Sequence, residues 1–307
     1  MLEAVGWSEE SVCSLRLRGG FSIAFSAPVD SLYAASAINE WVWACCDAKF
    51  GDGDAVDFDS QVAEIKAAIT EEVNPPLLEL QSAAIEHEVA FLWDDDEVSI
   101  GHGDHSHTWP FRELPDPAEL DWSKYQDVPV GIVTGTNGKT TTVRIAKHLL
   151  RTAGRSVGLS CTDWVSVNED IIDRDDWSGP GGARMVLRQP GIDTAILETA
   201  RGGLLRRGLG VETANVALIT NIAEDHLGDF GSQSVTELLD IKWVISHAVE
   251  EAGHLVLNAD DPLLVEKSRE FGGDLIWFSL SDSNQVVADH LNSGGVAFIY
   301  ADGNLVR

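Results

Sequence analysis

Residues 130–142, which read VGIVTGTNGKTTT, constrain the fold of this 307-residue chain more than any other segment. An apolar run typical of a buried strand leads into a glycine turn, and Lys139 and Thr140 then open a helical pattern. Glycines at positions 135 and 138 allow several backbone amides to turn toward one anion. The segment therefore predicts a phosphate-binding loop between a strand and a helix N-terminus.

Each residue of this loop has an expected task. Lys139 is expected to reach the terminal phosphates of a nucleotide, and the Thr140 hydroxyl is expected to ligate Mg²⁺. The other residues expected to contact the nucleotide are Gly135, Thr136, Asn137, Gly138 and Thr141. The Gly-x-x-Gly-Lys-Thr spacing is shorter than the usual phosphate-loop pattern. Because a strand and a helix flank it, we prefer nucleotide binding over a plain glycine turn.

From residue 128 onward, short apolar runs alternate with helical patterns as far as residue 278. Such alternation predicts an α/β fold in which a parallel sheet is flanked by helices. Residues 296–306, around Asp302 and Gly303, predict a terminal hairpin. We therefore predict a nucleotide-binding domain over residues 128–307.

Residues 1–127 lack this regular alternation and predict a smaller α+β domain with a linker. Residues 15–26 alternate like one strand, and residues 29–46 predict a helix. Pro75 and Pro76 start another helix. Two apolar runs flank the acidic turn at residues 94–96 and predict a hairpin, whereas residues 109–129 lack periodicity and are interpreted as the linker.

Polar side chains follow two further strands of the predicted sheet. Glu198 ends the run 195–198, and Asn221, Asp225 and His226 follow the run 215–220. Ligands of open parallel sheets bind beyond the carboxyl ends of the strands, so these residues should converge on the phosphate loop. There they would supply ligands beside a Mg²⁺-bound polyphosphate. The alternatives are an ion pair between Glu198 and Arg201, and a helix cap at His226.

Three arginines after Glu198 are candidates for holding an acidic substrate. Arg201, Arg206 and Arg207 carry guanidinium groups, whose geometry suits carboxylates. Salt bridges to nearby acidic residues explain them equally well. The histidines at positions 102, 105 and 107 have no spacing typical of a zinc site, so we interpret their segment as a polar loop.

The net charge of −29 argues against binding to nucleic acid or to anionic membranes. No apolar stretch is long enough to cross a bilayer, and no secretory signal is visible. The four cysteines lack the spacing of a zinc site or a disulfide scaffold, which favours the reducing cytoplasm. A homo-oligomer is compatible with the sequence.

Several motifs resemble one known family. Residues 134–141, 220–226 and 257–262 resemble the phosphate loop, the Asn-x-x-x-Asp-His motif and the Asn-Ala-Asp-Asp segment of Mur ligases and folylpolyglutamate synthases. Residues 178–186, 197–210 and 225–228 resemble the Mur-ligase-like half of the cyanophycin synthetases. The resemblance extends over residues 128–307.

This resemblance implies an ATP-dependent carboxylate–amine ligase that works through an acyl phosphate. Its cofactors would be ATP and Mg²⁺, and its partners an acidic small molecule or peptide and the amine of an amino acid. The matching positions are Lys139 for the phosphates and Thr140, Glu198 and His226 for the metal. Lys242, sixteen positions after His226, matches a lysine that many Mur ligases carbamylate. A solvated or ion-paired lysine is the alternative at that position.

In the family, a further helix and a C-terminal domain follow the Asn-Ala-Asp-Asp segment. Because this sequence ends at Arg307, we expect a partial chain that lacks the C-terminal ligase domain. Two other hypotheses are a nucleotide-binding subunit without catalysis and a phosphate-loop ATPase of another class. The ATPase hypothesis leaves the Glu-Thr-Ala-Arg-Gly-Gly and Asp-His motifs unexplained.

Overall fold

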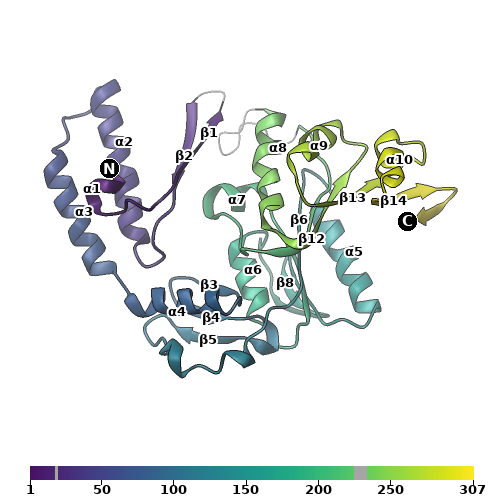
Figure 1. Cartoon of the computed structure of the whole chain (residues 1–307), viewed down its shortest axis with the longest axis horizontal. Helices are drawn as coiled ribbons and strands as arrows, with labels where there is room; N and C mark the ends of the chain where they lie inside the picture. Colours follow the sequence, from purple (N-terminus) through teal and green to yellow (C-terminus); the bar gives the residue numbers. More distant parts are fainter. Residues whose placement is uncertain (18–19, 225–233) are drawn as a thin grey trace. The chain divides into compact units, whose positions relative to one another are not determined.

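The computed structural model describes residues 1–17, 20–224 and 234–307 (Figure 1). They form two compact units, the first of which comprises Met1–Glu88 and Arg112–Leu120. The second unit comprises Val89–Phe111 and Asp121–Arg307. The strands predicted between residues 89 and 100 thus group with the second unit. The domain boundary between residues 127 and 128 stays a prediction.

The first unit combines a β-hairpin with helices. The stretch predicted as one strand is a hairpin, β1 Val12–Leu17 and β2 Gly20–Phe25, whose strands pair antiparallel. The helix predicted near residue 29 begins at Leu32, and the helix predicted at Pro75 begins there, with Leu77 and Leu80 buried. The helices are α1 Leu2–Val5, α2 Leu32–Phe50, α3 Phe58–Glu72, α4 Pro75–Glu86 and the short 3₁₀ helix η2 Pro117–Glu119.

The second unit begins with a three-stranded antiparallel sheet. The predicted hairpin around the acidic turn is confirmed as β3 Phe91–Trp93 and β4 Glu97–Ile100. A third strand, β5 His107–Pro110, pairs with β4 and occupies the start of the stretch that the sequence analysis interpreted as a linker. Short 3₁₀ helices, η1 Gly103–His105 and η3 Trp122–Lys124, complete this region.

The main sheet of the second unit has ten strands in the order β15-β14-β13-β12-β11-β6-β10-β7-β8-β9. The seven strands from β14 to β7 are parallel, and antiparallel strands extend the sheet at both ends. Their bounds are β6 Val130–Thr134, β7 Val157–Ser160, β8 Val165–Val167, β9 Asp170–Asp173, β10 Thr194–Glu198, β11 Ala214–Ile219, β12 Val249–Asn258, β13 Asp274–Ser279, β14 Val296–Ala301 and β15 Asn304–Val306. The predicted α/β fold and terminal hairpin are confirmed.

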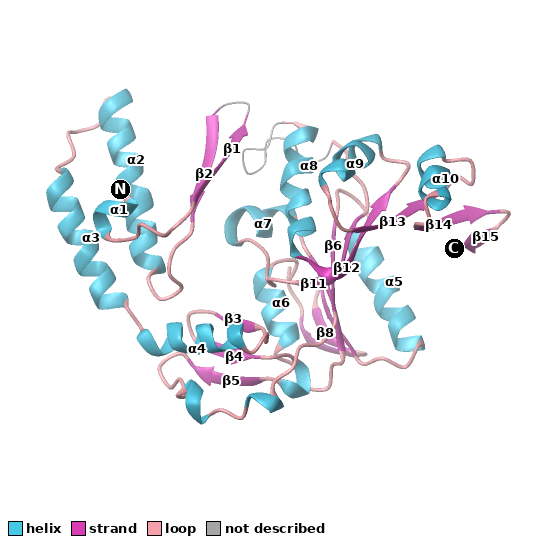
Figure 2. Cartoon of the chain, in the orientation of Figure 1, coloured by secondary structure: helices cyan, strands magenta, loops and turns pink. Residues whose placement is uncertain are grey.

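Helices cover both faces of this sheet because alternate strand residues point to opposite sides. Val133 packs with Val143 of α5 in one apolar cluster, whereas Ile132 belongs to the cluster that contains Val186 of α6. In Figure 2, α5 lies on one side of the strands, and α6 and α8 lie on the other. The helices are α5 Lys139–Thr152, α6 Pro180–Leu187, α7 Arg201–Arg207, α8 Val235–Trp243, η5 Val244–Ala248, α9 Pro262–Lys267, η6 Ser268–Glu270 and α10 Gln285–Asn292.

The strand order places the candidate residues along one edge of the sheet. Strands β10, β6, β11 and β12 are consecutive parallel neighbours, so their carboxyl ends face the same way. The segments that follow them start at Thr199, Gly135, Thr220 and Ala259. Within the described parts of the chain, no helix is both long and apolar enough to cross a bilayer.

Candidate nucleotide and metal site

The predicted phosphate loop joins β6 to α5 and depends on two glycines. Gly135 has φ +144° and Gly138 has φ +85°, conformations that L side chains rarely adopt. A Cβ at residue 135 would overlap Thr220 Oγ1 and lie 3.1 Å from Thr220 N. Gly138 is the N-cap of α5, so the loop leads directly into the helix whose first residue is Lys139. The partial positive charge of a helix N-terminus favours an anion at this point.

The segment after β11 holds the phosphate loop in place. Thr136 N donates to Asn221 O over 2.9 Å, and Asn137 N donates to Asn221 Oδ1 over 3.1 Å. Asn137 O in turn accepts from Asn221 Nδ2 at 3.0 Å and from Thr220 Oγ1 at 2.7 Å. The Asn221 amide therefore braces the loop, and its predicted contact with a nucleotide stays a prediction.

Asp261 supports this bracing segment from the next strand along the sheet. Its Oδ2 accepts from Ile222 N at 2.7 Å, while Oδ1 accepts from Leu263 N at 3.0 Å and caps α9. Asn258 Nδ2 also donates to Thr220 O over 3.2 Å. The Asn-Ala-Asp-Asp segment thus holds the segment after β11, which in turn holds the phosphate loop. Asp261 is thus the N-cap of α9.

Two lysine side chains bond to carbonyl groups of the phosphate loop. Lys139 Nζ donates to Thr136 O over 3.1 Å. Lys242 Nζ, from α8, donates to Gly135 O over 2.7 Å, and Lys242 is only 4% exposed. The solvated lysine considered as an alternative for position 242 is therefore wrong, because its side chain is buried beside the loop. Carbamylation of Lys242 stays a prediction.

Glu198 ends β10 with its carboxylate buried beside the first turn of α5. Its Oε1 accepts from Thr140 Oγ1 at 3.1 Å and from Thr162 Oγ1 at 2.8 Å, and its Oε2 accepts from Thr162 N at 3.2 Å. Glu198 is 1% exposed. Among the described residues, no cationic side chain forms an ion pair with it, so the predicted alternative of an arginine partner does not hold there.

The chemistry of these donors fits Mg²⁺. This ion prefers oxygen ligands and is usually held by one or two carboxylates together with phosphate oxygens and water. Glu198 and Thr140 offer a carboxylate and a hydroxyl beside the phosphate loop. Over the described residues, no group of three or more His, Cys, Asp or Glu side chains could hold a metal alone. Phosphate oxygens and water are the ligands that Mg²⁺ usually takes in addition to carboxylates.

The structure describes some of the remaining predicted residues and leaves others outside the described parts of the chain. Thr141 lies in the first turn of α5 and is exposed. Asp225 and His226 lie outside the described residues, so the predicted role of His226 in metal binding stays a prediction. Arg201 is the first residue of α7, and Arg206 lies in its last turn, where its Nε donates to Gly202 O over 3.0 Å.

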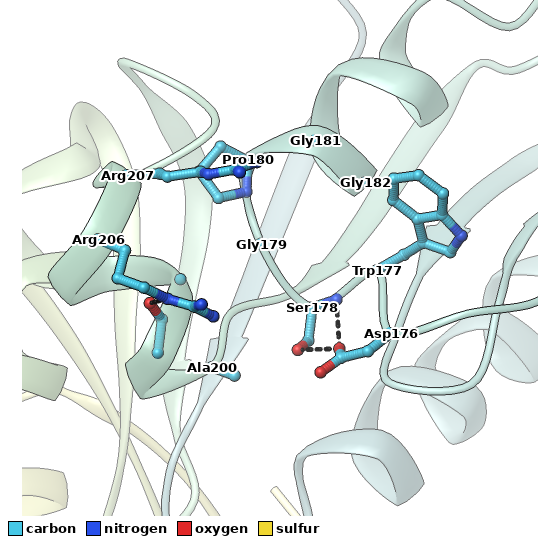
Figure 3. Close-up of a pocket in the computed structure, with 12 residues that line it drawn as sticks. Asp176, Trp177, Ser178, Gly179, Pro180, Gly181, Gly182, Ala200, Arg206 and Arg207 are labelled. Carbon is cyan, nitrogen blue, oxygen red and sulfur yellow. Dashed lines mark hydrogen bonds between the residues drawn. The ribbon is translucent and has the colours of Figure 1, made fainter. Parts of the chain in front are cut away.

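A cavity of about 380 Å³ lies beyond the end of β10 (Figure 3). Its walls come from the segment before α6, from the first turn of α6 and from α7. The lining residues are Asp176, Trp177, Ser178, Gly179, Pro180, Gly181, Gly182, Ala200, Gly202, Gly203, Arg206 and Arg207. Of the three arginines predicted to bind substrate, Arg206 and Arg207 line this cavity, and Arg201 is not among its described lining residues.

Ion pairs with the three-stranded sheet anchor α6 and therefore one wall of the cavity. Arg188, just after α6, donates to Asp94 Oδ2 over 2.6 Å and to Ser99 Oγ over 3.0 Å. Burial alone would raise the pKa of Asp94, but the hydrogen bond and charge of Arg188 hold it below the usual value. The acidic turn that the sequence analysis read only as a hairpin thus fixes the position of α6.

Sequence reasoning missed Thr162. Thr162 follows β7, and it meets Glu198 because β7 is the neighbour of β10 in the sheet.

The loop, the buried carboxylate beside it and the parallel sheet define a phosphate-loop domain of the α/β class. Residues 133–304 match the family model described as the Mur ligase middle domain. This match covers more than half of the chain, and the chain belongs to that family. The predicted resemblance to Mur ligases is confirmed.

The relatives named cyanophycin synthetase are also similar to this chain. The one from Geminocystis herdmanii is 35% identical over 77% of this chain and 27% of its own length. The one from Crocosphaera subtropica is 39% identical over 57% of this chain and 20% of its own length. The chain thus spans about a quarter of the length of these relatives. Among solved structures, MurF ligase from Thermotoga maritima in complex with ADP matches with a TM-score of 0.40 and 23% identity, over 50% of this chain and 33% of that one.

Proposed function

We propose that this chain is the ATP-binding part of an ATP-dependent carboxylate–amine ligase that forms ADP. The observation that carries the proposal is the pairing of a braced phosphate loop with the buried Glu198 carboxylate, 3.1 Å from Thr140 Oγ1. Membership of the Mur ligase middle domain family and similarity to cyanophycin synthetases support the ligase reaction. Because the chain spans about a quarter of those relatives, the activity belongs to the whole protein that carries it.

In this proposal the phosphate loop binds the β- and γ-phosphates of ATP. Backbone amides between Gly135 and Lys139 donate to phosphate oxygens, and Lys139 Nζ exchanges its bond with Thr136 O for the terminal phosphates. The buried Lys242 holds Gly135 O and keeps that carbonyl turned away from the anion. These groups reduce the repulsion that two anions, a triphosphate and a carboxylate, feel as they meet.

The proposed reaction has two steps. An oxygen of the substrate carboxylate attacks the γ-phosphorus, the bond to the β,γ-bridging oxygen breaks, and ADP leaves. The amine nitrogen of the second substrate then attacks the acyl carbon, the bond to the phosphate oxygen breaks, and the amine proton leaves with the released phosphate. Positioning and electrostatic stabilisation are therefore the main tasks of the protein.

Thr140 and Glu198 would hold Mg²⁺ when the nucleotide is bound. The ion would neutralise phosphate charge there. The carboxylate stays in place through its bonds to Thr162, so the site is organised before the ion arrives. His226 is the further ligand that the family pattern suggests.

The proposal extends to partners and location. The expected partners are an acidic small molecule or peptide and an amino-acid amine, and we assign the chain to the cytoplasm, where ATP is available. Four free cysteines, at positions 13, 45, 46 and 161, agree with a reducing compartment.

Lys139→Ala tests the proposal, with Lys124→Ala as the matched control because Lys124 is exposed and lies outside the phosphate loop. Calorimetry on this chain measures binding of a non-hydrolysable ATP analogue with Mg²⁺. ADP release is measured on the whole protein with candidate acids and amines. Lys139→Ala should lose about 3 kcal/mol of transition-state stabilisation, or about a hundredfold in rate, while Lys124→Ala stays normal.

Two outcomes would count against the proposal. Normal turnover of the Lys139→Ala variant would mean that the phosphate loop takes no part in the reaction. ADP release that does not depend on an acid and an amine would favour an ATPase of another class over a ligase.

A further inference from the structure

We propose that Arg144 is a positioning residue of the metal site and holds Glu198 in place through the loop formed by residues 161–164. This inference rests on the proposed function, because it takes Glu198 to be a ligand of Mg²⁺. Arg144 lies on α5, four positions after Thr140, so the two side chains project from the same side of the helix, one turn apart.

The 161–164 loop connects β7 to β8 and is closed at its base by bonds of its own. Cys161 N donates to Trp164 O over 3.0 Å, and Cys161 Sγ donates to the same carbonyl over 3.4 Å. Thr162, inside this loop, donates from its backbone N to Glu198 Oε2 and from its Oγ1 to Glu198 Oε1. One residue of the loop therefore holds both oxygens of the Glu198 carboxylate.

Arg144 contacts the two residues that follow Thr162. Its guanidinium donates to Asp163 Oδ2, and its Cζ lies 4.1 Å from the centre of the Trp164 ring. Arg174 lies over the same ring at 5.9 Å, so Arg144 is the nearer of the two cations. A guanidinium that pairs with a carboxylate and stacks on a tryptophan fixes both partners at once. These contacts attach the 161–164 loop to α5.

Together these contacts form a closed ring that begins and ends on α5. From Thr140 the ring passes to Glu198 and then to Thr162. The next residue, Asp163, returns it to the helix at Arg144. Without Arg144 the ring is open, so the 161–164 loop can move away from α5 and take the Glu198 carboxylate with it. The described side-chain contacts of Arg144 are with the loop, which allows the residue to be changed without altering the predicted metal ligands.

The sign of the effect distinguishes positioning from charge. Loss of Arg144 removes one positive charge from α5, and by Coulomb's law that change alone should strengthen the binding of a divalent cation. Loss of positioning should weaken it, because a carboxylate that can turn away is a poorer ligand. The partners that orient metal ligands typically contribute about 10- to 100-fold to metal affinity, and Arg144 acts one residue beyond such a partner.

The test measures the Mg²⁺ gain, defined as the ratio of the affinity for ADP with Mg²⁺ to the affinity without it. Both affinities come from isothermal titration calorimetry on this chain. Arg144→Ala should lower the Mg²⁺ gain by about 3- to 10-fold, less than the loss of a direct partner of the ligand. Arg144→Lys should restore part of it, because an ammonium keeps the charge but lacks the planar guanidinium.

Arg151→Ala is the matched control. Arg151 lies in the last turn of the same helix and pairs with Glu169 at 3.8 Å, so its loss removes the same charge and a similar ion pair. This variant should keep the full Mg²⁺ gain. Trp164→Leu removes the stacked ring without changing the charge, and it should lower the gain in the same direction as Arg144→Ala. It keeps the inference testable if Arg144→Ala does not fold.

A double-mutant cycle tests whether Arg144 acts through Glu198. Glu198→Gln impairs the ligand itself, so adding Arg144→Ala to that variant should change the Mg²⁺ gain no further. A further loss in the double variant would mean that Arg144 acts by another route, which would refute the positioning role.

This inference and the proposed function fail in different ways. If the wild type shows a Mg²⁺ gain and Arg144→Ala shows the same gain or a larger one, the positioning role is refuted and the nucleotide and metal site stands. An equal loss in Arg151→Ala would refute it as well. If the wild type binds no ADP, or shows no Mg²⁺ gain, the proposed function itself fails.

Discussion

Gly135→Ala should weaken nucleotide binding more than any other glycine substitution in the phosphate loop. The added Cβ would overlap Thr220 Oγ1, and the φ of +144° is strained for alanine. Such strain costs about 1–3 kcal/mol. Moving the Thr220 hydroxyl would also break its 2.7 Å bond to Asn137 O, which contributes about 1 kcal/mol.

These terms sum to about 2–4 kcal/mol against the loop conformation that faces the phosphates, which corresponds to roughly 30-fold to 1,000-fold weaker binding. Gly138→Ala is the matched comparison, because its φ of +85° is also strained but its Cβ would meet open space. The Gly138→Ala substitution should weaken nucleotide binding by only about 1–2 kcal/mol. Gly154→Ala, with φ +86° and open space at the far end of α5, should lower stability without changing nucleotide affinity.

Affinity is measured by isothermal titration calorimetry, with ADP and Mg²⁺ added to each variant. Stability is measured by thermal unfolding. The predicted order of affinity is wild type and Gly154→Ala, then Gly138→Ala, then Gly135→Ala. Equal losses in Gly135→Ala and Gly138→Ala, or wild-type affinity in Gly135→Ala, would refute the role assigned to the contact with Thr220.

Three further predictions concern buried and half-buried polar residues of the second unit and are checked by chemical denaturation. Asp261→Ala should destabilise the chain by about 2–4 kcal/mol, because α9 loses its cap and the buried Ile222 amide loses its acceptor; a loss below about 0.5 kcal/mol would contradict this. Arg188→Lys should cost about 1–2 kcal/mol, since an ammonium cannot reproduce the fork between Asp94 and Ser99, and wild-type stability would contradict it. Asp127→Asn should be more stable than the wild type at pH 7 by about 1–2 kcal/mol. Burial raises the pKa of Asp127 to about 6, so its charged form is penalised at pH 7, and the partial exposure of the side chain limits that penalty. That advantage should shrink as the pH falls from about 6 toward 4, where the wild-type carboxyl becomes protonated, and a constant difference would contradict the assignment.

The phosphate loop and Glu198 could be located from the sequence because the signals are local. Gly135, Gly138 and Lys139 are specified by the turn and the helix start, and the apolar run before Glu198 marks the end of a strand. The alternation of apolar runs was sufficient for the α/β class because the central strands are buried on both faces.

Other parts of the site depend on contacts that sequence patterns do not contain. Thr162 contacts Glu198, which is 36 positions later, only because β7 pairs with β10. The residues of a single strand do not determine which strand lies next to it in the sheet. The helices that line the cavity were missed for a local reason. Both α6 and α7 open with paired glycines, which disfavour helix formation, so tertiary packing rather than propensity stabilises them.

The Mg²⁺ dependence of ADP binding in Glu198→Gln tests the central claim most directly. In the wild type, Mg²⁺ should raise the affinity for ADP, because Glu198 and Thr140 would hold the ion beside the phosphates, where it would neutralise part of their charge. In Glu198→Gln this gain should largely disappear, while the affinity without Mg²⁺ stays equal or rises, since one negative charge near the phosphates is gone. An undiminished gain from Mg²⁺ in the variant would contradict the account.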